Sequence, residues 1–149
     1  MKTSELRIGN LINGIYYDFV NEDEYEEIEK ETICTVATLD STDMCDYRIY
    51  VESEADIETF SDFQPIPLTE EWLIKFGFEK LNTKMSDCFV FQKGLWRVAI
   101  KDDIEQNNAW VLWHERISPP TWCLSRFEYV HQLQNLYFAL TGEELKLHE

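Results

Sequence analysis

The residues of this chain that could hold a metal are few and widely spaced. Its three histidines, His114, His131 and His148, form neither an HExxH nor an HxH pattern. No two cysteines stand at CxxC spacing, and the nearest histidine–cysteine pair, Cys123 and His131, lies eight positions apart. A core thiol and an imidazole on a helix face are the favoured interpretation of that pair.

The acidic segment "DSTDMCD" is a second place to look for a metal site, because it holds Asp40, Asp43 and Asp46. An EF-hand loop requires ligands at alternate positions and a glycine at the sixth, and this segment has neither. We therefore predict that the protein has no zinc or calcium site.

Paired carboxylates for acid–base catalysis could come from Asp102, Asp103 and Glu105. These residues fall in a predicted connection between strands, where acidic residues are common. The chain contains no GxSxG, SxxK, phosphate-binding loop or GxGxxG motif. The sequence thus predicts no catalytic residue and no cofactor, although an enzyme whose site forms only in three dimensions remains an alternative.

The charge is strongly negative and unevenly spread. The formal net charge is −16; residues 1–62 hold 17 acidic and 4 basic residues, whereas residues 63–149 hold 12 and 9. Direct binding of nucleic acid is disfavoured, because neutralising phosphates requires clustered Lys and Arg. The candidate acidic patch consists of Glu22, Asp23, Glu24, Glu26, Glu27 and Glu29. It is either a solvated surface or a set of carboxylates that imitates nucleic-acid phosphates and occupies a basic groove.

No apolar run in the sequence approaches the roughly 20 residues of a membrane span. The first ten residues, "MKTSELRIGN", contain no apolar stretch typical of a signal peptide. The expectation is a cytoplasmic protein with free, mostly buried thiols and no membrane partner.

The pattern of elements predicts an α+β fold in two parts. Residues 1–63 contain several short segments rich in β-branched and aromatic residues, which predict a small N-terminal antiparallel β unit. Residues 64–149 predict an α-β-β-β-α unit that shares its core with the first. In this unit "PLTEEWLIKFGF" gives a helix with Thr69 as N-cap and Gly77 as terminator. Three strands, "DCFVFQK", "LWRVAIK" and "AWVLWHE", precede the last helix.

The last predicted helix has two uncharged faces. "SRFE" is a capping box with Ser125 at N-cap and Glu128 at N3, and Gly142 is placed to end the helix. One arc is expected to pack on the sheet and holds Tyr129, Val130, Leu133, Leu136, Tyr137 and Leu140. The opposite arc is a stripe of four residues, Phe127, His131, Gln134 and Phe138. Because exposed phenylalanines favour association, this stripe is predicted to contact the N-terminal β unit, a second copy or a protein partner.

Three blocks of the chain together resemble a known family. They are "LRIGNLI" at 6–12, "FQPIPLTEEWLIKFGF" at 63–78 and "YVHQLQNLYFALTGEEL" at 129–145. In these blocks the chain resembles a widespread family of small uncharacterised proteins from gut bacteria and their phages or prophages. The resemblance implies a mobile-element setting and a bacterial cytoplasmic location, and it carries over no site residues.

The favoured hypothesis is a non-enzymatic interaction or accessory protein of phage or prophage origin. The alternative is an acidic decoy that imitates DNA and binds a nucleic-acid-binding protein.

Overall fold

The computed structural model describes residues 5–19, 27–43, 46–53, 60–85, 88–101, 109–114 and 126–148. The chain divides into two compact units. The first unit contains residues 1–66 and 130–144, and the second contains residues 67–129 and 145–149. Strands and helices occur in both parts of the chain, and all strand pairs are antiparallel, which confirms a mixed α+β protein.

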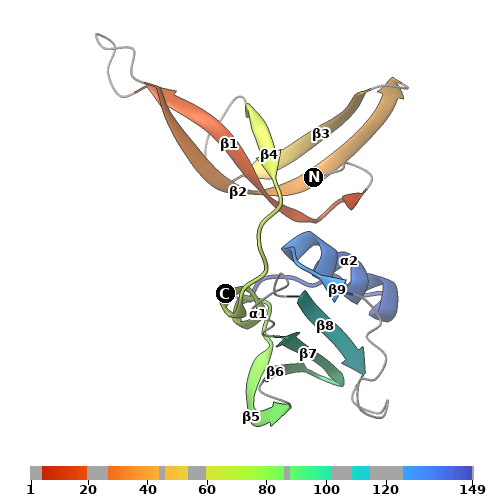
Figure 1. Cartoon of the computed structure of the whole chain (residues 1–149). Helices are drawn as coiled ribbons and strands as arrows, with labels where there is room; N and C mark the ends of the chain where they lie inside the picture. The colour runs from red at the N-terminus through yellow and green to blue at the C-terminus, as the bar shows by residue number, and fades with distance from the viewer. Residues whose placement is uncertain are drawn as a thin grey trace. The chain divides into compact units, whose positions relative to one another are not determined.

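The first unit is built on a four-stranded sheet in the order β3-β2-β1-β4. The strands are β1 (Leu11–Phe19), β2 (Glu27–Asp43), β3 (Asp46–Ser53) and β4 (Asp62–Gln64). The N-terminal half of β2 pairs with β1 and its C-terminal half pairs with β3, with register shifts between Val36 and Thr38 and between Asp40 and Asp43. Such irregularities bend a strand, and the two hairpins therefore extend in different directions from the middle of β2 (Figure 1).

One hydrophobic cluster of this unit lies on the face of the sheet that Ile12 and Cys34 share. It collects Leu6, Ile12, Cys34 and Val36, with Phe60 and Phe63 packed against them. Burial raises the pKa of the Cys34 thiol above its ordinary value, so this cysteine is a packing residue.

The second unit consists of a short helix and a five-stranded antiparallel sheet. Helix α1 spans Glu70–Lys75, and Gly77 follows its end with a positive φ of 77°, as the sequence predicts. Thr69 stands at the predicted N-cap position with an extended backbone, but its side chain makes no capping hydrogen bond. The sheet order is β5-β6-β7-β8-β9. The strands are β5 (Glu79–Met85), β6 (Cys88–Lys93), β7 (Trp96–Lys101), β8 (Ala109–His114) and β9 (Arg126–Phe127).

The prediction of three strands in this region was incomplete. The predicted segments correspond to β6, β7 and β8, whereas β5 and β9 were missed. β5 is polar, "EKLNTKM", and β9 has only two residues, so neither carries the alternation that marks a strand in sequence.

The last helix, α2 (Val130–Thr141), differs from the prediction in its start and in its unit. Phe127 pairs with Trp110 in the edge strand β9, so the residues of the expected capping box precede the helix. The Val130 N–H donates to the Ile66 carbonyl at 2.9 Å, which gives the helix a different beginning. Gly142, at φ 75°, ends the helix as predicted. Helix α2 belongs to the first unit, where it packs on β1.

Within the described residues, no helix is long and apolar enough to cross a membrane.

Candidate functional site

The most elaborate polar arrangement in the first unit joins α2 to the segment that precedes β1. Gln134 is 2 % exposed. Its side-chain oxygen accepts from the Leu11 N–H at 2.9 Å, and its side-chain nitrogen donates to the Gly9 carbonyl at 3.2 Å. One amide side chain thus forms hydrogen bonds with the backbone on both sides of Asn10. The backbone of a residue in a neighbouring strand would form the same two bonds.

Asn135 extends this contact. Its oxygen accepts from the Asn10 side chain at 2.9 Å, and its nitrogen donates to the Glu5 carbonyl at 2.7 Å. The Arg7 guanidinium lies 3.8 Å above the Phe138 ring and donates to the Glu144 carboxylate at 2.7 Å. We call residues 5–11 the docking segment. It is held on α2 by amide hydrogen bonds and one cation–π contact.

His131 lies in the same contact region and is completely buried. Its Nε2 atom is 3.9 Å from the Glu5 carboxylate. Burial lowers the pKa of His131 below its usual value of 6.5, and the nearby Glu5 carboxylate acts in the opposite direction as a smaller effect. The folded protein therefore favours the neutral imidazole near neutral pH.

We expect the lowered pKa of His131 to make the first unit less stable in mild acid. Its folded-state pKa lies below the unfolded value, so the stabilisation is fully present above pH 6.5 and falls as the pH drops from 6.5 towards the folded pKa. Each unit of lowering corresponds to about 1.4 kcal/mol. Urea unfolding between about pH 7.5 and 5.5 measures the slope. His131→Gln, which does not titrate, should flatten it; an unchanged slope in this variant would refute the assignment.

The four residues of the predicted contact stripe belong to two different units. Phe127 is buried in β9 of the second unit, and the other three residues lie on α2 of the first. His131 and Gln134 are buried, and Phe138 is half-buried beneath Arg7. The three α2 residues contact the docking segment of their own chain. On the opposite arc, Leu140 was expected to face the sheet but is 39 % exposed.

Exposed acidic residues lie on the other face of the first sheet, which also holds the buried Leu11 and Ile15. Register places Glu31, Ile15 and Asp62 side by side on β2, β1 and β4. Glu29 lies two residues from Glu31 and therefore on the same face, and Ile33 follows with 43 % of its surface exposed. We call Glu29, Glu31, Asp62 and Ile33 the acidic sheet face.

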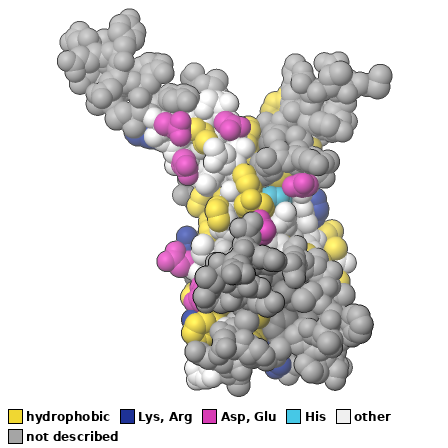
Figure 2. Space-filling view, viewed as in Figure 1, with side chains coloured by type: hydrophobic (Ala, Val, Ile, Leu, Met, Phe, Trp, Pro, Cys, Tyr) yellow, Lys and Arg dark blue, Asp and Glu magenta, His cyan; other side chains and the backbone are white. Residues whose placement is uncertain are grey.

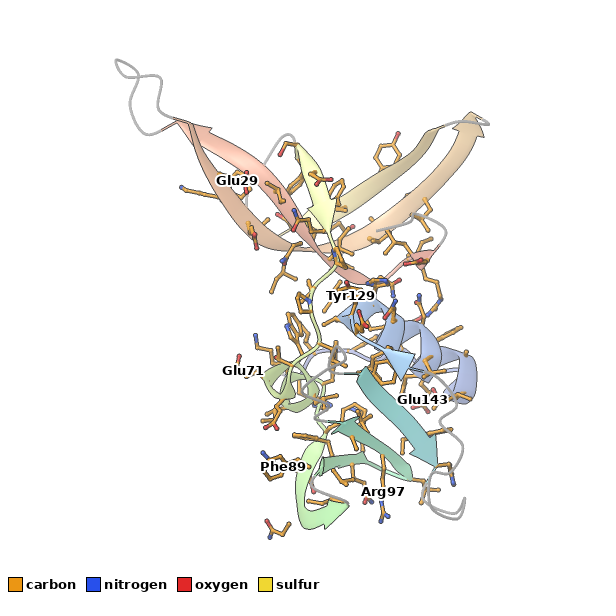
Figure 3. The ribbon with its side chains drawn as sticks, viewed as in Figure 1. Glu29, Glu71, Phe89, Arg97, Tyr129 and Glu143 are labelled. Carbon is orange, nitrogen blue, oxygen red and sulfur yellow. The ribbon has the colours of Figure 1, made fainter. Side chains whose placement is uncertain are left out.

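The acidic sheet face carries exposed carboxylates. Within the described paired positions of β1, β2 and β4, this face holds no Lys or Arg. Its carboxylates are exposed, and Glu31 accepts from the Asn13 side chain at 3.2 Å. Figure 2 shows acidic side chains over the region of β1, β2 and β4, with apolar side chains between them. Figure 3 labels Glu29 on this sheet.

Two residues of the predicted acidic patch, Glu27 and Glu29, belong to the described part of β2. Glu29 is exposed on β2, and Glu27 stands at the first position of the same strand. The positions of Glu22, Asp23, Glu24 and Glu26 lie outside the described residues. Sequence reasoning found the acidic run but missed Glu31 and Asp62, because the strand register that brings them together is a tertiary property.

The second unit contains one unexpected polar contact. The Lys93 ammonium donates to the Phe76 carbonyl at 2.5 Å and lies 3.0 Å from His148 Nε2. The backbone N–H of His148 donates to the Lys75 carbonyl at 2.8 Å. A Cβ atom on Gly77 would come within 2.5 Å of the His148 ring. These groups satisfy carbonyls at the end of α1, so we interpret the contact as a helix cap.

Among the described residues, no group of three or more His, Cys, Asp or Glu is arranged to hold a metal ion. The positions of Cys123, Asp102, Asp103 and Glu105 lie outside those residues. Comparison with protein-family models, with curated proteins and with solved structures finds no match to this chain.

Proposed function

We propose that this protein is a non-enzymatic interaction protein that binds a basic protein segment through the acidic sheet face. The observation that supports this is the row of Glu29, Glu31 and the exposed Ile33 along one face of β2, with Asp62 on the same face of β4. A partner segment in which Lys or Arg lies next to an apolar side chain would match both the carboxylates and Ile33.

The charge of the whole N-terminal part supports the same partner chemistry. Residues 1–62 carry a net charge of −13, so their field attracts a basic partner over distances beyond direct contact. Exposed ion pairs contribute only about 0.2–1 kcal/mol each. We therefore expect fast, salt-sensitive association of modest affinity, in which Ile33 supplies the apolar part of the contact.

The test uses two variants with equal net charge. The first neutralises the acidic sheet face with Glu29→Gln, Glu31→Gln and Asp62→Asn. The second changes three exposed residues outside this face: Glu71→Gln, Glu79→Gln and Glu143→Gln. Titration with a synthetic peptide of alternating Lys and Val, followed by fluorescence anisotropy, should show about tenfold weaker binding for the first variant. Equal binding by the two variants would overturn the proposal.

Affinity capture from a bacterial lysate with the same two variants extends the test to natural partners. A partner that the wild type and the second variant retain, and that the first variant loses, supports the proposal. The resemblance of the three sequence blocks supports a phage or prophage origin, and it makes gut bacteria the appropriate source of the lysate.

A decoy that imitates DNA is the second candidate. It is favoured by the strand positions of Glu29 and Glu31, which are two residues apart and lie on the same face of β2. Alternate residues of a strand lie about 6.6–6.8 Å apart, a spacing comparable to that of successive phosphates along one nucleic-acid strand. A decoy should compete with duplex DNA for a basic DNA-binding protein, and the competition should weaken steeply with salt.

A further inference from the structure

The central segment of β3 would match a second copy of itself in an antiparallel pair. Tyr50 is the centre of "RIYVE", residues 48–52. On either side of it stand two β-branched residues, Ile49 and Val51, and then two opposite charges, Arg48 and Glu52. In an antiparallel pair of identical strands centred on Tyr50, Arg48 of each strand stands opposite Glu52 of the other.

The position of β3 in the sheet suits such a pairing. β3 is the last strand in the order β3-β2-β1-β4, so one of its edges faces away from β2. Tyr50 is 50 % exposed, although large aromatic side chains are usually well covered. An edge strand with an exposed aromatic residue is a template for adding another strand.

We propose that β3 pairs with β3 of a second copy of this chain, antiparallel and centred on Tyr50. The pairing forms two Arg48–Glu52 cross-strand pairs, one Tyr50–Tyr50 contact and two Ile49–Val51 contacts. Opposite charges and aromatic residues directly across from one another are the pairs that stabilise antiparallel strands. The two copies are then related by a two-fold axis, as expected for a dimer built from one self-complementary surface.

The dimer would have a consequence for the proposed function. Residues directly opposite in a sheet lie on the same face, so the acidic sheet faces of both copies would lie on one side of the joined sheet. A partner with two basic segments would then bind both copies and gain avidity. This consequence rests on the proposed function, whereas the pairing itself does not.

The net charge of the chain opposes association. Two copies of −16 repel one another, and the contact buries little more than one strand on each side. The dimer should therefore be weak, and screening of the long-range repulsion should strengthen it as salt rises from low to moderate concentration. That salt dependence is opposite in sign to the one expected for binding of a basic partner.

Arg48 and Glu52 could have the opposite effect on association. Charged residues on an edge strand can prevent association, and within its own sheet Arg48 stands opposite Asp40. If the charges act only in this way, the protein stays monomeric at every concentration. The oligomeric state therefore separates the two roles.

The experiment is sedimentation equilibrium of the full chain over a wide concentration range, with two charge-reversed variants. Arg48→Glu places like charges opposite one another twice, and so does Glu52→Arg. Each variant alone should raise the dissociation constant of the dimer about tenfold or more. Mixed in equal amounts, the two variants should form a heterodimer, because each Glu then faces an Arg.

The equal mixture of the two variants distinguishes a loss of pairing from a loss of stability, because an unstable variant would not form the heterodimer. Arg48→Glu brings two carboxylates opposite one another at Asp40, so circular dichroism must first show that it is folded. Glu143→Arg, the same change as Glu52→Arg at an exposed position outside β3, should leave the dimer intact. A wild-type monomer at all concentrations would overturn the proposal, as would a mixture that associates no better than its components. Neither result depends on whether the acidic sheet face binds a basic peptide.

Discussion

Replacing Gln134 by leucine is expected to lower the free energy of unfolding of the first unit by about 3 kcal/mol. A leucine side chain has a similar volume. It can neither accept a hydrogen bond from the Leu11 N–H nor donate one to the Gly9 carbonyl. The Leu11 N–H would then lose its hydrogen-bond partner in a buried environment and the Gly9 carbonyl in a part-buried one, and each such loss costs up to about 1–3 kcal/mol. Thermal and urea unfolding followed by circular dichroism measure the change.

Amide hydrogen exchange gives a local measure of the same effect. The Leu11 amide should exchange faster in Gln134→Leu, whereas amides of β7 in the second unit should keep their wild-type rates. Gln64→Leu is the matched control, because Gln64 is exposed on β4 and its replacement should change stability by no more than about 0.5 kcal/mol. A variant as stable as this control would show that the Gln134 amide does not hold the docking segment.

Replacing Gly14 by valine is expected to destabilise the first unit by about 2–3 kcal/mol, although valine favours strands. A Cβ atom at this position would lie 2.5 and 2.6 Å from two carbons of the Phe60 ring and 2.7 Å from Cys34 Sγ. These contacts are too short, so the ring must move out of the core that it shares with Phe63. Urea unfolding measures the cost, and Thr38→Val at an exposed position of β2 is the control.

A second substitution tests the proposed cause. Phe60→Ala alone should destabilise the unit by removing a core ring, but combined with Gly14→Val it removes the two ring contacts of the new side chain and leaves only the one with Cys34. The two changes should therefore be strongly non-additive, with a coupling of about 1–3 kcal/mol. Additive effects would mean that the close approach of Phe60 does not explain the glycine.

The local signals in the sequence determined several elements without help from the rest of the fold. The position of Thr69, the acidic first turn and Gly77 mark the bounds of helix α1, and Gly142 ends α2. The predicted apolar segments of β6, β7 and β8 were also correct in place and type. These features depend on capping, backbone conformation and side-chain period, which act between residues close in sequence.

The start of α2 and its partners were decided only by the tertiary structure. The capping box at 125–128 is a sound local signal, yet Arg126 and Phe127 pair with β8, and a strand pair of this kind outweighs one helical turn. The role of Gln134 was equally hidden. A glutamine in a helix is usually solvated, and its hydrogen bonds to Gly9 and Leu11 join residues more than 120 positions apart.

The acidic sheet face shows the same division between sequence and structure. Composition alone established that residues 1–62 are strongly acidic, because charge is a sum over residue types. Which carboxylates share a surface depends on strand register, and a shift of one residue would move every side chain of β2 to the opposite face. Glu31 and Asp62 therefore share one surface because β1 pairs with both β2 and β4.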